Sequence, residues 1–97
     1  MPNLLKTNPF TTGTAGTSAI TVKEPGHGRS TGDTVRFYDG NDFDGITATN
    51  INRSTGYTIN VSDVDTYTFT VATDTATTGN ITGGGFPVYA GPATITP

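Results

Sequence analysis

The chain of 97 residues contains no cysteine, so neither a disulfide framework nor a thiolate metal site can form. It also lacks any apolar run long enough to cross a membrane. The apolar pair near the N-terminus, Leu4-Leu5, is too short for the core of a signal peptide. The length predicts a single domain with a thin core, which partner subunits could supplement.

Charged residues are scarce, at 13% of the chain, and the formal net charge is −3. A nucleic-acid-binding protein needs clustered lysine and arginine against the phosphates. The basic residues are few and scattered: Lys6, Lys23, Arg29, Arg36 and Arg53. The sequence therefore predicts neither a nucleic-acid partner nor a membrane partner.

Threonine is abundant, with 22 residues, beside 13 glycines and 6 prolines. Threonine is β-branched and favours strands, whereas glycine and proline punctuate turns. Apolar and polar residues alternate, as in half-buried strands, in 19-AITVK-23, 34-TVRFY-38, 57-YTINV-61 and 67-YTFTV-71. This alternation argues against disorder, and the lack of an apolar period of 3.6 predicts almost no helix.

These segments predict an all-β fold, either a small β-barrel or a sandwich, of about six to seven short antiparallel strands. Residues 62–66 lie between two of the segments and are rich in turn formers, which predicts a hairpin. The outer faces of the strands carry threonine. Such faces keep a sheet soluble without charge and suit lateral packing against another protein.

The two ends differ from the middle of the chain. Residues 1–18 show no alternation and predict an extended N-terminal arm, whereas residues 19–97 form a single β domain. Leu4, Leu5 and Phe10 are the apolar residues with which such an arm could contact a neighbouring subunit. The alternative is that these residues fold back onto their own domain.

The stretch 26-GHGRSTGDTVRF-37 is rich in glycine and has the look of a phosphate-binding loop. A phosphate loop of the Walker type needs Gly-Lys-Ser or Gly-Lys-Thr, but here Gly32 is followed by Asp33, whose carboxylate repels phosphate. A strand follows the loop, so no helix N-terminus is available for an anion. The stretch therefore predicts a tight turn before Val35 and Phe37 enter the core.

His27 is the only histidine, and it has no evident catalytic partner. The serines are few, and none lies in a nucleophile-elbow pattern. A histidine bonded to the backbone of a loop is the better interpretation. The sequence predicts no catalytic and no cofactor-binding residue, and hence no enzyme.

Two acidic turns raise the question of calcium. Asp39, Asn41, Asp42 and Asp44 could supply oxygen ligands, but Phe43 occupies a ligand position of the EF-hand register and the final glutamate is absent. Asp63 and Asp65 pose the same question in the predicted hairpin. Turns whose side chains bond to the backbone are the better interpretation, and no metal ligand is predicted.

One pattern of residues extends over about residues 8–90. Its pieces are Asn8-Pro9-Phe10-Thr11-Thr12, His27-Gly28, Gly32-Asp33, Val35, Phe37, Tyr57-x-Ile59-x-Val61, Asp63-x-Asp65-Thr66-Tyr67-Thr68-Phe69, Gly83-Gly84-Gly85 and Val88. The pattern resembles a small β-barrel module of the virion structural proteins of tailed bacteriophages. That module is also similar to a β-barrel inserted in ubiquitin-activating enzymes, a likeness of fold from which no activating function follows. The central loop, residues 39–55, departs from the commoner form, which has a plain glycine soon after the strand.

The resemblance implies a non-enzymatic structural protein of the bacteriophage virion. Because one module makes up nearly the whole chain, we expect an accessory subunit that binds the particle in many copies. It would act as capsid decoration (a cement protein) or as a coat of the tail or neck. Its expected partners are other virion proteins, such as the major capsid protein or tail and neck proteins, and copies of itself.

The alternative function is a β module of a tail or fibre that binds a host surface or a glycan. Such a module needs aromatic side chains on an outer face. Most aromatic residues fall on the faces assigned to the core, and Tyr38 and Tyr89 are the possible exceptions.

Overall fold

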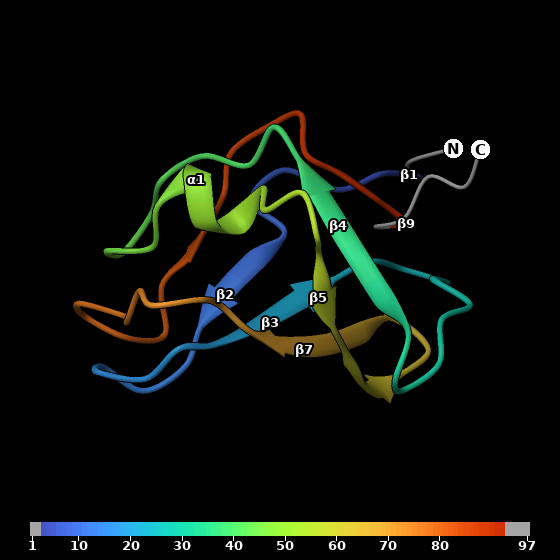
Figure 1. Cartoon of the computed structure of the whole chain (residues 1–97), viewed down its shortest axis with the longest axis horizontal. Coiled ribbons are helices and arrows are strands. Elements are labelled where there is room, and N and C mark those ends of the chain that lie inside the picture. Colours follow the sequence, from blue (N-terminus) through green and yellow to red (C-terminus); the bar gives the residue numbers. More distant parts are fainter. Residues whose placement is uncertain (1–2, 93–97) are drawn as a thin grey trace.

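The computed structural model describes residues 3–92 and has a nearly all-β fold (Figure 1). Within these residues it contains nine strands and one helix, α1 (Ala48–Ile51). The strands are β1 (Asn3–Leu4), β2 (Phe10–Thr12), β3 (Ala19–Lys23), β4 (Thr34–Tyr38), β5 (Tyr57–Thr58), β6 (Asn60–Asp63), β7 (Thr66–Thr70), β8 (Thr82–Gly83) and β9 (Tyr89–Pro92).

The strands form two antiparallel sheets around a shared core. The four-stranded sheet has the order β1-β9-β4-β5, and the five-stranded sheet has the order β6-β7-β3-β2-β8. In Figure 1, β4 runs across the direction of β3 and β7. The predicted all-β class is confirmed, and the sheets are not closed into a barrel.

Three of the four alternating segments became single strands. β3 and β4 have the predicted bounds, β7 is shifted by one residue, and residues 64–65 form the tight turn of the predicted β6–β7 hairpin. The fourth segment, 57-YTINV-61, is divided between the sheets: β5 pairs with β4, and β6 pairs with β7. Ile59 lies at the crossing, where its N–H donates to Asp33 O at 3.0 Å and its carbonyl accepts from Gly32 N at 2.9 Å.

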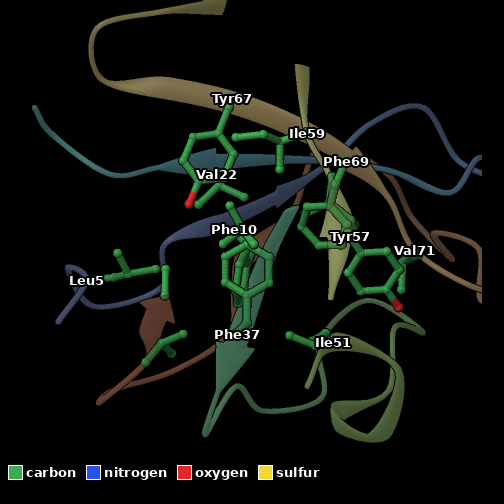
Figure 2. Packing of buried hydrophobic residues seen from close by; sticks show 14 of the residues in the cluster. Leu5, Phe10, Val22, Phe37, Ile51, Tyr57, Ile59, Tyr67, Phe69 and Val71 are labelled. Carbon is green, nitrogen blue, oxygen red and sulfur yellow. The ribbon is translucent and has the colours of Figure 1, made fainter. Parts of the chain in front are cut away.

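Aromatic side chains from both sheets fill the core (Figure 2). The ring of Phe10 meets that of Phe37 edge-on, with centroids 5.0 Å apart. Phe69 stacks on Phe37 at 5.1 Å and lies 4.7 Å from the ring of Tyr57. Phe69 was predicted to be in the core, and its exposed fraction is 3%. The faces assigned from the alternation are therefore correct.

The predicted N-terminal arm is wrong for the residues that the structure describes. β1 is an edge strand of the four-stranded sheet, and β2 lies inside the five-stranded sheet, between β3 and β8. Phe10 is fully buried, and Leu5 is 3% exposed. The alternative, in which this segment folds onto its own domain, is confirmed, so no boundary exists at residue 18. Strands of two and three residues are too short to show alternation, which is why the sequence did not reveal them.

The central loop carries the short helix. Thr47 caps α1, with its side chain accepting from Asn50 N at 3.4 Å, and Ile51 is buried below. Asp74, in the connection between β7 and β8, fixes the same cap, because its carboxylate accepts from Thr47 N and Thr47 Oγ1, both at 2.8 Å. Across residues 3–92, no helix is both long enough and apolar enough to span a bilayer.

Candidate functional site

The His27-Gly28 motif lies in the connection from β3 to β4 and is fixed by hydrogen bonds. Nδ1 of His27 accepts from Arg29 N at 2.8 Å, and Nε2 lies 2.8 Å from the carbonyl oxygen of Asp63. A carbonyl only accepts, so Nε2 carries the proton and donates it. The imidazole also meets the ring of Tyr67 edge-on at 5.2 Å. Nε2 therefore joins the connection to the β6–β7 hairpin, and Nδ1 fixes the backbone of the connection itself.

Glu24, the only glutamate of the chain, lies beside His27 and is 4% exposed. Its Oε1 accepts from Arg29 Nε at 3.1 Å and from the hydroxyl of Tyr67. Its Oε2 accepts from Arg29 Nη2 at 3.2 Å and from Asn3 Nδ2 at 3.2 Å. Asn3 belongs to the four-stranded sheet and Tyr67 to the five-stranded one. The carboxylate therefore links the two sheets at one edge of the core.

The ionisation of this network is suited to a structural role. Burial, followed by the hydrogen bond to Glu24, raises the pKa of Tyr67 far above its usual range. Burial tends to lower the pKa of Arg29, but the hydrogen bond to Glu24 and its charge outweigh burial and raise it. Arg29 therefore stays charged and Tyr67 stays neutral over the ordinary pH range, so neither group exchanges protons there.

A pocket of about 450 Å³ lies next to the network. It is lined by Asn3, Leu4, Leu5, Lys6, Glu24, Pro25, Gly26 and His27. Ligand sites orient their occupants with a few free polar groups. Here the side chains of Glu24, Asn3 and His27 are already bonded within the protein. The pocket therefore offers a shape and the ammonium group of Lys6, but no free acid, base or nucleophile of the kind that catalysis needs.

The predicted turn in the glycine-rich stretch is confirmed. Asp33 N donates to Ser30 O at 3.0 Å, and Ser30 N donates to Asp33 Oδ2 at 2.9 Å. Gly32 has a φ of 97° and donates its N–H to Ile59 O at 2.9 Å. Three backbone N–H groups that could face a phosphate are thus bonded inside the protein.

The first acidic turn uses its carboxylates to hold backbone. Asp44 accepts from Thr12 Oγ1 at 2.7 Å, from Thr78 N at 2.7 Å and from Gly79 N at 2.9 Å. Desolvation tends to raise the pKa of Asp44, but these hydrogen bonds outweigh it and lower the pKa. Asp42 accepts from Ala48 N at 2.6 Å.

The second acidic turn behaves in the same way. Asp63 Oδ1 accepts from Asp65 N at 2.8 Å, which lowers the pKa of Asp63, and Asp65 Oδ1 accepts from Gly26 N at 2.9 Å. Among residues 3–92, no three His, Cys, Asp or Glu side chains are grouped as a metal site requires.

Tyr38 and Tyr89 lie together on the outer face of the four-stranded sheet. They are direct cross-strand neighbours on β4 and β9, and Leu4 of β1 is the next residue in the same row. Leu4 is 56% exposed, and both tyrosines are partly exposed. Arg36, two residues from Tyr38 on the same face, places its guanidinium 4.5 Å from the centroid of that ring. We call these four residues the tyrosine patch.

The structure separates the three residues predicted as assembly contacts. Leu5 and Phe10 are in the core, where they cannot contact a neighbour, so this prediction is wrong for both. Leu4 remains exposed and belongs to the tyrosine patch. Leu4 and Leu5 differ because successive side chains of an extended chain point to opposite faces, and Phe10 is buried as part of β2.

Glu24 and Arg36 were not singled out from the sequence as site residues. The signal available for Glu24 was that a lone glutamate stands five residues before an arginine in a chain with little charge. The signal for Arg36 was its position between Val35 and Phe37, both assigned to the core, which places it on the outer face with Tyr38. Neither signal identifies the partner strand, which comes from long-range pairing.

Comparisons with models of known families, with curated proteins and with solved structures found no match to this chain.

Proposed function

We propose that the protein is a non-enzymatic structural subunit of a tailed-bacteriophage virion. It binds the particle in many copies, as capsid decoration or as a coat of the tail or neck. The sequence pattern from Asn8-Pro9-Phe10 to Val88 supports this role, because it resembles that of virion modules.

The observation that carries the proposal is that His27 of the pattern and the neighbouring Glu24 are both hydrogen-bonded within the fold. His27 is bonded through both nitrogens, and the carboxylate of Glu24 accepts from three side chains. A general acid or base must be free to exchange a proton with a substrate. His27 and Glu24, the candidates for catalysis, therefore have structural roles. The proposed function depends on the surface of the protein instead.

The surface suits a subunit that packs among others. The outer face of the five-stranded sheet carries a row of side chains in cross-strand register: Thr82, Thr11, Thr21, Thr68 and Asn60. We call this the threonine row. The other sheet presents the tyrosine patch. Two broad faces with little charge allow close lateral packing, since few ions have to be desolvated.

The test is to purify particles of the phage that encodes the chain and to measure its copy number by quantitative mass spectrometry. We expect many copies per particle, retained after a density gradient. Recombinant protein should also sediment with particles from a phage in which the gene is deleted. Absence of the chain from purified particles, together with no sedimentation, would overturn the proposal.

A second candidate function is the binding of a host-surface glycan. The observation in its favour is the exposed pair Tyr38 and Tyr89, because sugars pack on aromatic rings and hydrogen-bond to polar groups beside them. The test is a glycan array probed with the wild type and with Tyr89→Ala. Binding of a defined glycan that is lost in the variant would support this function over the first.

A further inference from the structure

The polar side chains of the tyrosine patch have no hydrogen-bond partners among residues 3–92, unlike the two tyrosines of the core. In the core, the hydroxyl of Tyr57 donates to Asn50 O, and that of Tyr67 donates to Glu24. By contrast, Tyr38 and Tyr89 make no side-chain hydrogen bond to any residue in 3–92. Their hydroxyl groups remain available to a partner.

Arg36 shows the same property more strongly. Its Nε is buried, yet it has no hydrogen-bond partner within the described part of the chain. Within residues 3–92 the ion pair joins Arg29 to Glu24, so Arg36 has no carboxylate partner there. Its cross-strand neighbour on β9 is Gly91, which offers no side chain. Buried donors are normally satisfied, so this one calls for an explanation, and an acceptor supplied by a partner would be one.

The backbone holds the patch in a fixed geometry. β4 and β9 are paired over four residues, from Tyr38 with Tyr89 to Val35 with Pro92. The residues that alternate with the patch, Phe37 and Ala90, are fully buried on the inner face. A preformed surface loses less conformational entropy when it binds, which favours affinity.

The residue types indicate the class of partner. Tyrosine and arginine, together with tryptophan, are the residues most enriched where protein–protein binding energy is concentrated. Small ligands bind in concave sites, whereas the patch lies on the face of a sheet. Arg36 is a cation on a chain with a net charge of −3 and pairs with no acid among residues 3–92, so a carboxylate of the partner would complement it.

We propose that the tyrosine patch, Leu4, Arg36, Tyr38 and Tyr89, is the surface through which this subunit binds another virion protein. The complementary surface presents an Asp or Glu carboxylate framed by aliphatic side chains. The carboxylate accepts from the guanidinium of Arg36, and the aliphatic groups cover Leu4 and the two rings. This inference rests on the proposed function and adds the surface and the chemistry of its partner.

The experiment measures sedimentation of labelled protein with particles from the gene-deleted phage. The variants are Arg36→Gln and Tyr89→Ala in the patch. Lys23→Gln is the matched control, since it also removes one positive charge but lies on the outer face of β3, in the other sheet. Circular dichroism and the melting temperature establish that each variant is folded.

We expect each patch variant to bind about tenfold more weakly or worse, while Lys23→Gln binds like the wild type. Binding of the wild type should weaken as salt is raised, and Arg36→Gln should show a smaller dependence on salt. If the wild type binds particles and both patch variants bind with the same affinity, the inference is overturned while the proposed function stands. Loss of binding in Lys23→Gln alone would also overturn it and assign the interface to the five-stranded sheet.

Two further outcomes would distinguish the proposed partner from no particle binding and from a glycan. If the wild type does not bind particles at all, both the proposed function and this inference fail. If the patch variants lose binding to a defined glycan but keep binding to particles, the patch is a sugar site and the inference is overturned.

Discussion

The buried carboxylate of Glu24 stabilises one edge of the core. It is buried, and Arg29, Tyr67 and Asn3 all donate to it. Removing one partner of a buried ion pair leaves the other charge uncompensated. We therefore expect Glu24→Gln to lower the free energy of unfolding by about 3 kcal/mol, measured by urea denaturation.

The matched control for that change is Asp39→Asn. It also replaces an acid with its amide, but Asp39 is exposed and no described residue bonds to its side chain. Its φ of 64° suits asparagine as well as aspartate. We expect a change within about 0.5 kcal/mol. Equal losses in the two variants would contradict a structural role for the Glu24 network.

Asp44 makes the stability of the protein depend on pH in the acidic range. Its pKa is lowered in the folded state, because its hydrogen bonds to Thr78, Thr12 and Gly79 outweigh desolvation. A lowered folded-state pKa contributes stability above the ordinary pKa of about 4 and loses it as the pH falls further. Asp63 and Asp74 act in the same direction. We therefore expect the urea midpoint to fall between pH 6 and pH 3.

The contribution of Asp44 can be isolated with Asp44→Asn. This variant should be less stable than the wild type at pH 6, and its midpoint should change less on going to pH 3. The comparison requires only urea titrations, monitored by circular dichroism, at pH 6 and pH 3. A pH dependence identical to that of the wild type would show that the carboxylate of Asp44 is not held as described.

Among the elements, the glycine run 83–85 serves as a packing surface. A Cβ on Gly83 would lie 2.6 Å from Phe43, and one on Gly84 would lie 2.5 Å from the ring of Phe10. Gly84→Ala therefore meets a clash in addition to strain at a φ of 105°. We expect it to cost about 3 kcal/mol or more in the free energy of unfolding.

Gly32→Ala is the control for the clash. Gly32 has a φ of 97°, close to that of Gly84, but nothing lies within 4 Å of the added Cβ. It should cost only the backbone strain, about 1–2 kcal/mol. The same loss in both variants would mean that Phe10 moves aside without cost.

The sequence revealed elements that are long enough to show their period. β3, β4 and β7 each have five residues, and their alternation gave both their location and their buried face. β1 and β8 have two residues each, so no period exists to detect. The division of 57-YTINV-61 was also hidden, because Tyr57, Ile59 and Val61 pack against the same core in whichever sheet they belong to.

The candidate site was less predictable than the fold. Tyr38 and Tyr89 could be recognised as exceptions to the core, but that they are direct neighbours depends on the pairing of β4 with β9 across about 50 residues. Leu4 joins them only because β1 pairs with β9. Register of this kind is set by the whole sheet and by no local motif.

At the scale of the whole molecule, residues 3–92 share one core and should unfold as a single cooperative unit. Deleting residues 2–12 removes Phe10 and Leu5 from that core and exposes the edges of β3 and β8. We therefore expect the truncated chain to be unfolded by circular dichroism. The wild type should show a β spectrum and one transition in urea.

A folded, cooperatively melting chain after this deletion would restore the idea of a separate arm. The control is Leu4→Ala, which changes the same segment without touching the core, since Leu4 is 56% exposed. We expect that variant to fold normally and to change the free energy of unfolding by no more than about 0.5 kcal/mol.

If the protein coats a particle as proposed, the threonine row affects how its copies are arranged. Where Thr11 and Thr82 meet, their hydroxyl oxygens are 3.0 Å apart, and either can be the donor. A hydroxyl group that rotates can reverse its polarity, so a line of them presents no fixed pattern of donors and acceptors. A neighbour lying on this face would find equivalent hydrogen bonds after sliding along it or turning around. Orientation would then have to come from the opposite face, and the same subunit could tolerate the small changes of angle that a curved shell imposes on chemically identical contacts.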